Sequence, residues 1–283
     1  MTSTVSIAAP FTAGESAVSH RRLLMCSARY FRIDYEINPY MHVGVQPDVE
    51  AAVAEHEDII AAHLAAGRKV EFLDADPACP DMTYTANAAV VRGDRAVLAT
   101  LPPERAAETP HHRTWLESHG FEVAETRYAF SGQGDALACG DLLLAAHGQR
   151  TDARAFRTLA RHLNCEIVSL RTTSPRWYDL DLAVAVIHPG RMLAYNPEAL
   201  DTASLRRLRG LGMDLIEVTP AEAAAFALNL ISDGRTVTMT SGAPRLAADL
   251  RATGLTVVEL ETRELRKGGG GVRCTALTLD NPA

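Results

Sequence analysis

The sequence contains no uninterrupted apolar run long enough to cross a lipid bilayer, so no membrane partner is expected. Positive charge is also scarce: 28 Lys and Arg residues stand against 35 Asp and Glu residues, which gives a formal net charge of -7. Because no basic stripe is present to neutralise phosphates, nucleic acid is not an expected partner. Residues 1–14 lack a basic stretch followed by an apolar one, so no signal peptide is predicted. These absences favour a cytoplasmic globular protein, and the mild acidity fits a small cationic ligand.

Motifs that hold disulfides or metals are missing as well. The five cysteines show no CxxC spacing, and the ten histidines show no HExxH or comparable ligand spacing. An odd, dispersed set of cysteines indicates reduced thiols in a cytosol rather than a disulfide framework. The sequence therefore predicts no metal site and no cofactor. The cysteines are Cys26, Cys79, Cys139, Cys165 and Cys274.

The chain does contain a repeated unit: an amphipathic helix, a glycine or asparagine that ends it, and an apolar strand. Glycine or asparagine directly after a helix is typical of a left-handed C-terminal cap. The five expected helices cover residues 48–66, 104–119, 152–163, 202–211 and 244–253. Their stops are Gly67, Gly120, Asn164, Gly212 and Gly254, and the strands that follow cover 70–73, 121–124, 165–170, 213–218 and 255–260.

Short paired strands lie between these copies. Turns such as Asp233-Gly234 between apolar runs predict β-hairpins at 88–100, 183–195 and 228–240, with 142–146 as the partner strand of a less clear one. Five such units without a capping repeat favour closure into a ring. We therefore expect one α/β domain over residues 16–283, a pseudo-fivefold propeller of five ββαβ-like modules, after a flexible tail over 1–15. An ordinary α/β sheet with irregular insertions is the alternative.

The segment from Lys267 to Cys274 carries the strongest chemical signal. Four consecutive glycines, 268–271, leave the backbone without Cβ atoms, so it can adopt positive φ angles and approach a ligand closely. Cys274 opens an alternating apolar stretch, 274–279, that predicts a short strand. A thiol at a strand edge beside such a loop is well placed to attack a bound molecule. A flexible linker before a small buried cysteine is the structural alternative.

Four further polar clusters fall in different modules or at their junctions: 81–87, 130–135, 149–152 and 177–181. In a ring, functional groups collect where inner strand ends meet the axis, so these clusters predict a central site. Asp179 and Asp181 are two residues apart and are expected on one face of a strand, where they need cations, water or a ligand. Structural alternatives are a helix cap for Asp152, a tight turn around Asp135 and a surface ion pair for Arg150.

Taken in order, these motifs resemble those of the guanidine-modifying superfamily, which includes dimethylarginine dimethylaminohydrolases, arginine deiminases and amidinotransferases. The motifs are DxxxTAN at 81–87, FxGxGDAL at 130–137 (with Ser131 and Gln133 at the variable places), RTD at 150–152, YxLD at 178–181 and KGGGGVRC at 267–274. Residues 25–41 also resemble the opening of bacterial members. The resemblance covers nearly the whole chain. It implies the pseudo-fivefold propeller, or pentein, fold, in agreement with the repeat.

The resemblance further implies hydrolysis of the guanidine group of arginine or an N-substituted arginine through a covalent cysteine adduct. Cys274 is then the nucleophile, and Asp179 and Gln133 take the other catalytic positions. A small cationic guanidino substrate and a homodimer are the expected partners. The expected substrate-binding residues are Asp81, Asn87, Asp135, Arg150, Asp181, Gly269 and Gly270.

Two positions depart from the family pattern. The usual His-x-Asp motif, whose histidine is a general acid and base, has Asp179 in place of the histidine, and the region of the usual glutamate has Ser131 and Gln133. An unperturbed aspartate titrates near 3.9, whereas a proton shuttle at neutral pH needs a value near 7, a gap of about 4 kcal/mol. His147 is a candidate substitute imidazole. Amidino transfer to an amine and a non-catalytic guanidinium-binding protein therefore stay open as alternatives.

Overall fold

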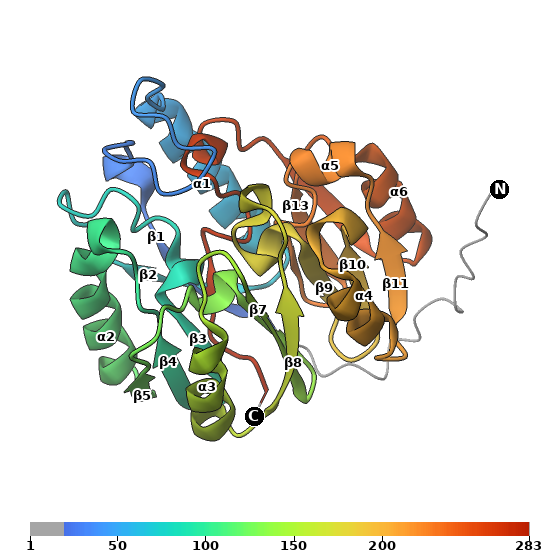
Figure 1. Cartoon of the computed structure of the whole chain (residues 1–283). Helices are drawn as coiled ribbons and strands as arrows, with labels where there is room; N and C mark the ends of the chain where they lie inside the picture. Colours follow the sequence, from blue (N-terminus) through green and yellow to red (C-terminus); the bar gives the residue numbers. More distant parts are fainter. Residues whose placement is uncertain (1–19, 283) are drawn as a thin grey trace.

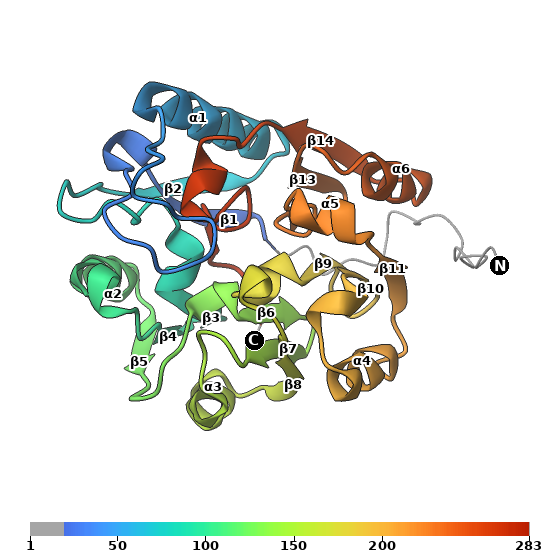
Figure 2. The same cartoon turned by 45° about the horizontal axis from the view of Figure 1, so that its top comes forward.

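The structure is a computed structural model, and it describes residues 20–282. Strands within this range form five three-stranded sheets, which surround a common centre with the larger helices on the outside (Figures 1 and 2). In every sheet the middle strand pairs antiparallel with one neighbour and parallel with the other. The parallel pair is connected by a helix, as a parallel connection requires. The predicted pseudo-fivefold architecture is confirmed.

Four modules share one plan, a hairpin followed by a helix and a parallel strand. The second module has β3 (Ala89–Arg92), β4 (Arg95–Leu98), α2 (Thr109–Ser118) and β5 (Glu122–Glu125). The third has β6 (Ala136–Cys139), β7 (Leu142–His147), α3 (Phe156–Leu163) and β8 (Glu166–Arg171). The fourth has β9 (Val184–His188), β10 (Met192–Tyr195), α4 (Thr202–Arg209) and β11 (Asp214–Glu217). The fifth has β12 (Ile231–Ser232), β13 (Thr236–Thr240), α6 (Pro244–Ala252) and β14 (Thr256–Leu260), preceded by α5 (Pro220–Ala224).

The first module joins the two ends of the described chain. β1 (Arg22–Cys26) pairs parallel with β2 (Lys69–Leu73) across α1 (Val49–Ala65), and antiparallel with β15 (Leu277–Thr278). The C-terminal strand thus supplies the buried antiparallel strand that the other modules build locally as the first strand of a hairpin. This exchange closes the ring and brings the segment before β15 back toward the centre.

Local sequence explains the ends of the helices. Asp48 caps α1 by accepting a hydrogen bond from the amide of Ala51, and Asp201 caps α4 in the same way. All five expected stop residues have positive φ, from 49° at Asn164 to 90° at Gly254. The strands differ in burial. Residues of β3, β6, β9 and β10 are buried throughout, whereas β5 and β14 are partly exposed.

Two expected strands are wrong. Cys274 lies in a turn, closed by the bond from the Thr275 amide to the Gly271 carbonyl, and only Leu277–Thr278 of the expected strand 274–279 is extended. Asp179 precedes a short 3-10 helix, η7 (Leu180–Leu182), so it and Asp181 do not share one strand face.

The structure also bears on the expected membrane spans, metal sites and chain boundaries. No helix among residues 20–282 is long and apolar enough to span a bilayer, and no group of three metal-ligating side chains in that range is arranged around a possible ion. The expected tail over 1–15 lies outside the described residues. The single domain over 16–283 stays a prediction.

Candidate active site

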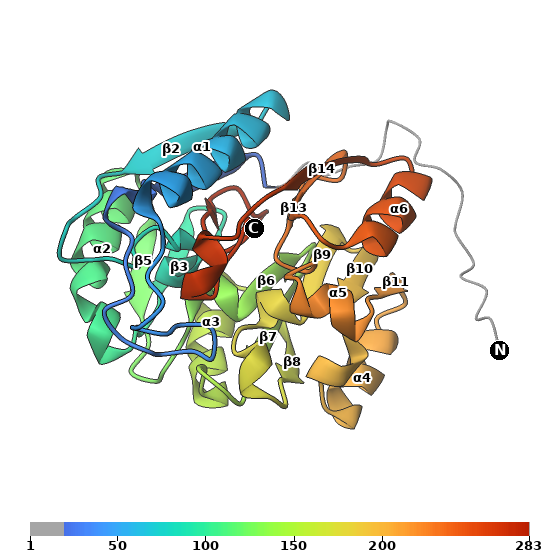
Figure 3. The ribbon, with the colours of Figure 1, turned by 90° about the horizontal axis from the view of Figure 1, so that it is seen from above.

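A small pocket lies where segments of several modules meet. Its volume is ≈ 10 Å³, about the room that one water molecule needs. In Figures 2 and 3 the red segment after β14 runs inward to the middle of the molecule, and this segment supplies Cys274. The lining residues are Ile37, Asn38, Asp81, Tyr84, Asn87, Arg105, Arg150, Tyr178, Gly268, Gly270 and Cys274. We call this space the front pocket.

A wider outer cavity of ≈ 400 Å³ shares four lining residues with the front pocket: Ile37, Asn38, Arg150 and Tyr178. Glu36 also lines this cavity, so with Arg150 both charge signs are present. A molecule with a compact cationic end and a polar, amino-acid-like body would place the first in the front pocket and the second in the outer cavity.

Cys274 is buried and held by two side chains. Its Sγ lies 3.1 Å from Nδ2 of Asn229 and 3.2 Å from Oδ2 of Asp181. Burial, followed by the charges of Asp181 and Asp179, raises the pKa of the thiol well above its usual range. The resting cysteine therefore carries its proton at neutral pH, and a cationic substrate beside it would favour the thiolate.

Asn229 organises the backbone around the thiol and was not found from the sequence. Its Oδ1 accepts hydrogen bonds from the amides of Gly271, Arg273 and Cys274, at 3.0, 3.0 and 3.2 Å. It is fully buried, just before β12. Its only sequence signal is a lone polar residue inside the apolar run 227–231.

The glycine run has a steric purpose at two positions. A Cβ on Gly270 would lie 2.6 Å from the ring of Tyr84 and 2.8 Å from Cβ of Cys274. Gly269 has φ +94°, and its Cβ would lie 2.6 Å from the hydroxyl of Tyr178, which donates to the Gly269 carbonyl. Gly270 lines the front pocket, whereas Gly269 shapes the turn beside it.

Asp81 is the front-pocket carboxylate. It is 2% exposed, and burial above all raises its pKa to about 6. Its Oδ1 has no hydrogen-bond partner within the described part of the chain. The Tyr35 hydroxyl lies beside this carboxylate and acts to lower its pKa, but Oδ1 forms no hydrogen bond of good geometry. Because such a buried oxygen is costly, Asp81 has room for a cationic donor.

Asp179 is held in a separate network beside the pocket. Its carboxylate accepts from Nδ2 of Asn87 at 3.0 Å, Oγ of Ser131 at 2.7 Å and Nη1 of Arg150 at 3.3 Å. The guanidinium of Arg150 also lies 4.1 Å from the ring centre of Tyr178. Asp179 thus orders Asn87 and Arg150, both of which line the front pocket.

Arg105 is a second pocket residue that the sequence did not reveal. Its guanidinium forms two 2.8 Å bonds with the carboxylate of Glu108 and donates to Oδ1 of Asn87 at 3.0 Å. Burial acts to raise the pKa of Glu108, but Arg105 and His112 together outweigh it and the pKa is lowered. The buried pair fixes which way the Asn87 amide faces.

Asp135 and Gln133 lie away from the front pocket. Asp135 accepts from the amide of Leu180 at 3.0 Å and from the hydroxyl of Thr151 at 2.6 Å. Gln133 accepts from the Arg273 guanidinium and bonds the backbone of Thr278 in both directions. Both side chains therefore brace the segments that carry Asp181 and Cys274, with no contact to the thiol in residues 20–282.

Asp181 and two of the weaker candidates also have defined places. Asp181 contacts Cys274 but does not line the front pocket. Asp152 caps the 3-10 helix η5 (Ala153–Ala155), so it has the structural role that the sequence offered as an alternative to a functional one. His147 packs its ring against Phe156 and does not line the pocket.

Comparison with known proteins agrees with this geometry. The family model for "N,N dimethylarginine dimethylhydrolase, eukaryotic" matches residues 40–279. The chain belongs to the dimethylarginine dimethylaminohydrolase family. It is 40% identical to the N(G),N(G)-dimethylarginine dimethylaminohydrolase of Mycobacterium tuberculosis, over 92% of this chain and 86% of that protein.

Cyanobacterial relatives are similar over a domain. The chain is 32% identical to the bifunctional arginine dihydrolase/ornithine cyclodeaminase AgrE of Nostoc, over 93% of this chain but only 38% of that protein. Its fold matches the N-terminal domain of ArgZ, covalently bound to a reaction intermediate, with a TM-score of 0.89 and 31% identity over 92% of this chain and 98% of that one. The dimethylarginine dimethylaminohydrolase family and these structures share the pentein fold found here.

Proposed function

We propose that this chain hydrolyses the guanidine group of arginine or an N-substituted arginine through a covalent adduct on Cys274. One observation carries the proposal: Cys274 and the unpartnered carboxylate oxygen of Asp81 face the same small central pocket. A guanidinium group offers the donors that Asp81 lacks, and its carbon is the atom that a thiolate attacks. Relatives named as dimethylarginine dimethylaminohydrolase and arginine dihydrolase support the same chemistry.

The reaction has two halves. Sγ of Cys274 loses its proton and forms a bond to the guanidinium carbon, while the C=N π electrons move to nitrogen. The C–N bond to ammonia or an alkylamine then breaks, the departing nitrogen takes a proton, and an S-linked amidino adduct remains. Water adds to the same carbon, the C–S bond breaks, and the ureido product and the thiol are released.

The outer cavity supplies the remaining contacts. The amino-acid part of the substrate lies there beside Arg150, which the resemblance assigns to the substrate carboxylate. Because the front pocket has room for about one water molecule, its lining has to widen for a guanidinium to enter; Ile37 and Asn38 line both cavities.

Asp179 serves as a positioning residue in this proposal. Its three hydrogen-bond donors occupy its carboxylate and include two pocket residues, Asn87 and Arg150. The substitution of the usual histidine is therefore paired with Ser131, which donates to the same carboxylate from the position of the usual glutamate. The proton chemistry then requires a different group.

The compartment and assembly remain part of the proposal. All five cysteines are free, and four of them are buried, which supports a reducing, cytoplasmic setting. A homodimer is proposed from the family resemblance alone, and light scattering of the purified protein measures it directly. No cofactor enters the reaction as written.

Product analysis tests the proposed function. L-arginine, monomethylarginine and dimethylarginine are incubated with the protein, and ureido product and released amine are quantified. We expect product from the parent protein and from Cys139→Ala, a buried cysteine outside the pocket, and none from Cys274→Ala. Product from Cys274→Ala would contradict the proposal.

Two other outcomes separate the alternatives. Product that appears only with an added amine acceptor would indicate amidino transfer. Heat of arginine binding without any product would indicate a guanidinium-binding protein.

A further inference from the structure

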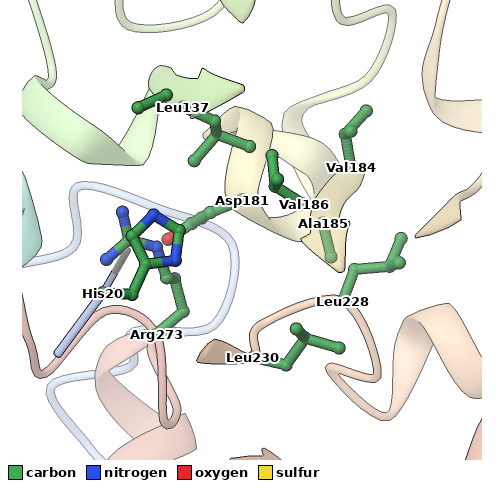
Figure 4. Close-up of a pocket in the computed structure, with 10 residues that line it drawn as sticks. His20, Leu137, Asp181, Val184, Ala185, Val186, Leu228, Leu230 and Arg273 are labelled. Carbon is green, nitrogen blue, oxygen red and sulfur yellow. The ribbon is translucent and has the colours of Figure 1, made fainter. Parts of the chain in front are cut away.

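A second small cavity shares no lining residue with the front pocket, and one of its lining residues is Asp181, which contacts Cys274. Its volume is also ≈ 10 Å³. Figure 4 shows three polar side chains around it, His20, Asp181 and Arg273, against an apolar wall. The wall includes Leu137, Ala138, Val184, Leu228 and Leu230. We call this space the rear cavity.

Asp181 stands between the thiol and the rear cavity. Its Oδ2 lies 3.2 Å from Sγ of Cys274, whereas its Oδ1 is buried and without a hydrogen-bond partner in residues 20–282. Asp181 lines the rear cavity and not the front pocket. A buried polar atom beside a water-sized, polar-lined space is where an exchangeable water is expected.

We propose that Asp181 is the proton-transfer group of Cys274, and that water in the rear cavity keeps it in exchange with solvent while substrate fills the front pocket. This inference rests on the proposed function. The proton of Sγ passes to Oδ2 of Asp181 as the C–S bond forms. It passes on to the departing nitrogen as the C–N bond breaks. In the second half Asp181 accepts a proton from the attacking water and returns it to sulfur as the C–S bond breaks.

The surroundings of Asp181 suit this task. Burial, and next the charge of Asp179, raises its pKa to about 7, while Arg273 acts in the opposite direction. The Arg273 guanidinium stays in place because it donates to Gln133 and to the Ala276 carbonyl. A group that titrates near neutral pH, in contact with the nucleophile, is efficient in proton transfer.

The other polar groups around Asp181 are not suited to transfer the proton of Cys274. His20 faces the same cavity, but burial above all lowers its pKa to about 4, so it is neutral at pH 7. Asn229 donates to the thiol and carries no exchangeable acid proton. Asp179 is occupied by Asn87, Ser131 and Arg150.

Asp181→Asn and its matched partner Asp179→Asn test the inference. Three quantities are measured across pH 5 to 10, in the range where these groups titrate: steady-state kcat, KM, and the rate at which iodoacetamide alkylates Cys274 without substrate. For Asp181→Asn we expect kcat to fall by about 10²-fold or more with little change in KM, and the acidic limb near pH 7 to disappear. Asp179→Asn keeps an acidic limb, moved to lower pH because the charge of Asp179 no longer raises the pKa of Asp181.

Alkylation gives a readout that needs no turnover. In the parent protein the rate rises in two steps, as the carboxyl and then the thiol lose their protons. In Asp181→Asn the step that belongs to the carboxyl is lost, and the single remaining step lies at lower pH than the thiol step of the parent because a carboxylate charge no longer raises the pKa of the thiol. If the parent protein turns over no guanidine at all, the two-step profile still tests Asp181 and the failure belongs to the proposed function.

The rear cavity is tested by filling it. Ala138→Val narrows the cavity, so the acidic limb is expected to move to higher pH as Asp181 loses its solvent contact. Ala145→Val, on the neighbouring strand and outside the cavity, is the control for packing. An Asp181→Asn enzyme with raised KM, unchanged kcat and an intact acidic limb would overturn the inference and make Asp181 a substrate-binding group.

Discussion

Replacing Asn229 by Ala removes the one side chain that holds both the thiol and the backbone around it. Three buried amides, of Gly271, Arg273 and Cys274, lose their shared acceptor. Each unpaired buried amide costs at least about 1 kcal/mol, so unfolding becomes easier by about 3 kcal/mol. For a chain of this size that lowers the melting temperature by about 6 °C.

The same substitution alters the chemistry of the thiol. Asn229 lowers the pKa of Cys274 by donating to Sγ, against the larger effects of burial and of Asp181 and Asp179. Its loss therefore raises that pKa further and slows alkylation at pH 8. The assays are differential scanning fluorimetry and iodoacetamide labelling followed by mass spectrometry.

A matched buried asparagine provides the control. Asn196 is equally buried and its Oδ1 accepts from one amide only, that of Glu198, away from the pocket. Asn196→Ala is expected to cost about 1 kcal/mol and to leave alkylation of Cys274 unchanged. If Asn229→Ala melts and alkylates like the parent protein, the assigned part of Asn229 is refuted.

Three further predictions concern the pocket. Asp81→Asn should raise KM for arginine at least tenfold with a smaller change in kcat, and because the pKa of Asp81 is about 6, the parent's affinity, measured by calorimetry, should weaken as pH falls through 6. Gly270→Ala should abolish product formation because its Cβ would meet Tyr84 and Cys274, whereas Gly44→Ala, which meets nothing within 4 Å, should not. Arg105→Met leaves Glu108 buried without its partner, so denaturant unfolding should show a loss of about 3 kcal/mol or more; an unchanged midpoint would count against the buried pair.

The predictable part of the fold rests on local signals. Helix stops such as Gly67 and Asn164, and turns such as Gly93-Asp94, are set by backbone preferences within a few residues, and they occur where expected. The pairing of β1 with β15 was not predicted. Its second strand has two residues, too few to show a period, and its partner lies at the other end of the chain.

The site divides in the same way. Cys274, Asp81, Asn87, Arg150 and Gly270 were named from motifs, and the structure places them around one pocket. Asn229 and Arg105 were missed because each is a single polar residue in a segment with no motif. The ring brings Asn229 to Cys274, and the folding of the second module brings Arg105 to Asn87. The direction of the Asp181 side chain could not be predicted from the sequence either. The alternating pattern predicted a strand, but the Asp135 carboxylate binds the amide of Leu180, which begins a 3-10 helix.

The covalent adduct on Cys274 is the central claim, and mass spectrometry of the acid-quenched protein tests it most directly. The protein is mixed with excess arginine or dimethylarginine, quenched within the first turnovers, digested and mapped. We predict an added mass equal to the substrate less its departing amine, on the peptide that contains Cys274. Ureido product that accumulates with Cys274 unmodified at every quench time, and that also forms in Cys274→Ala, would contradict it.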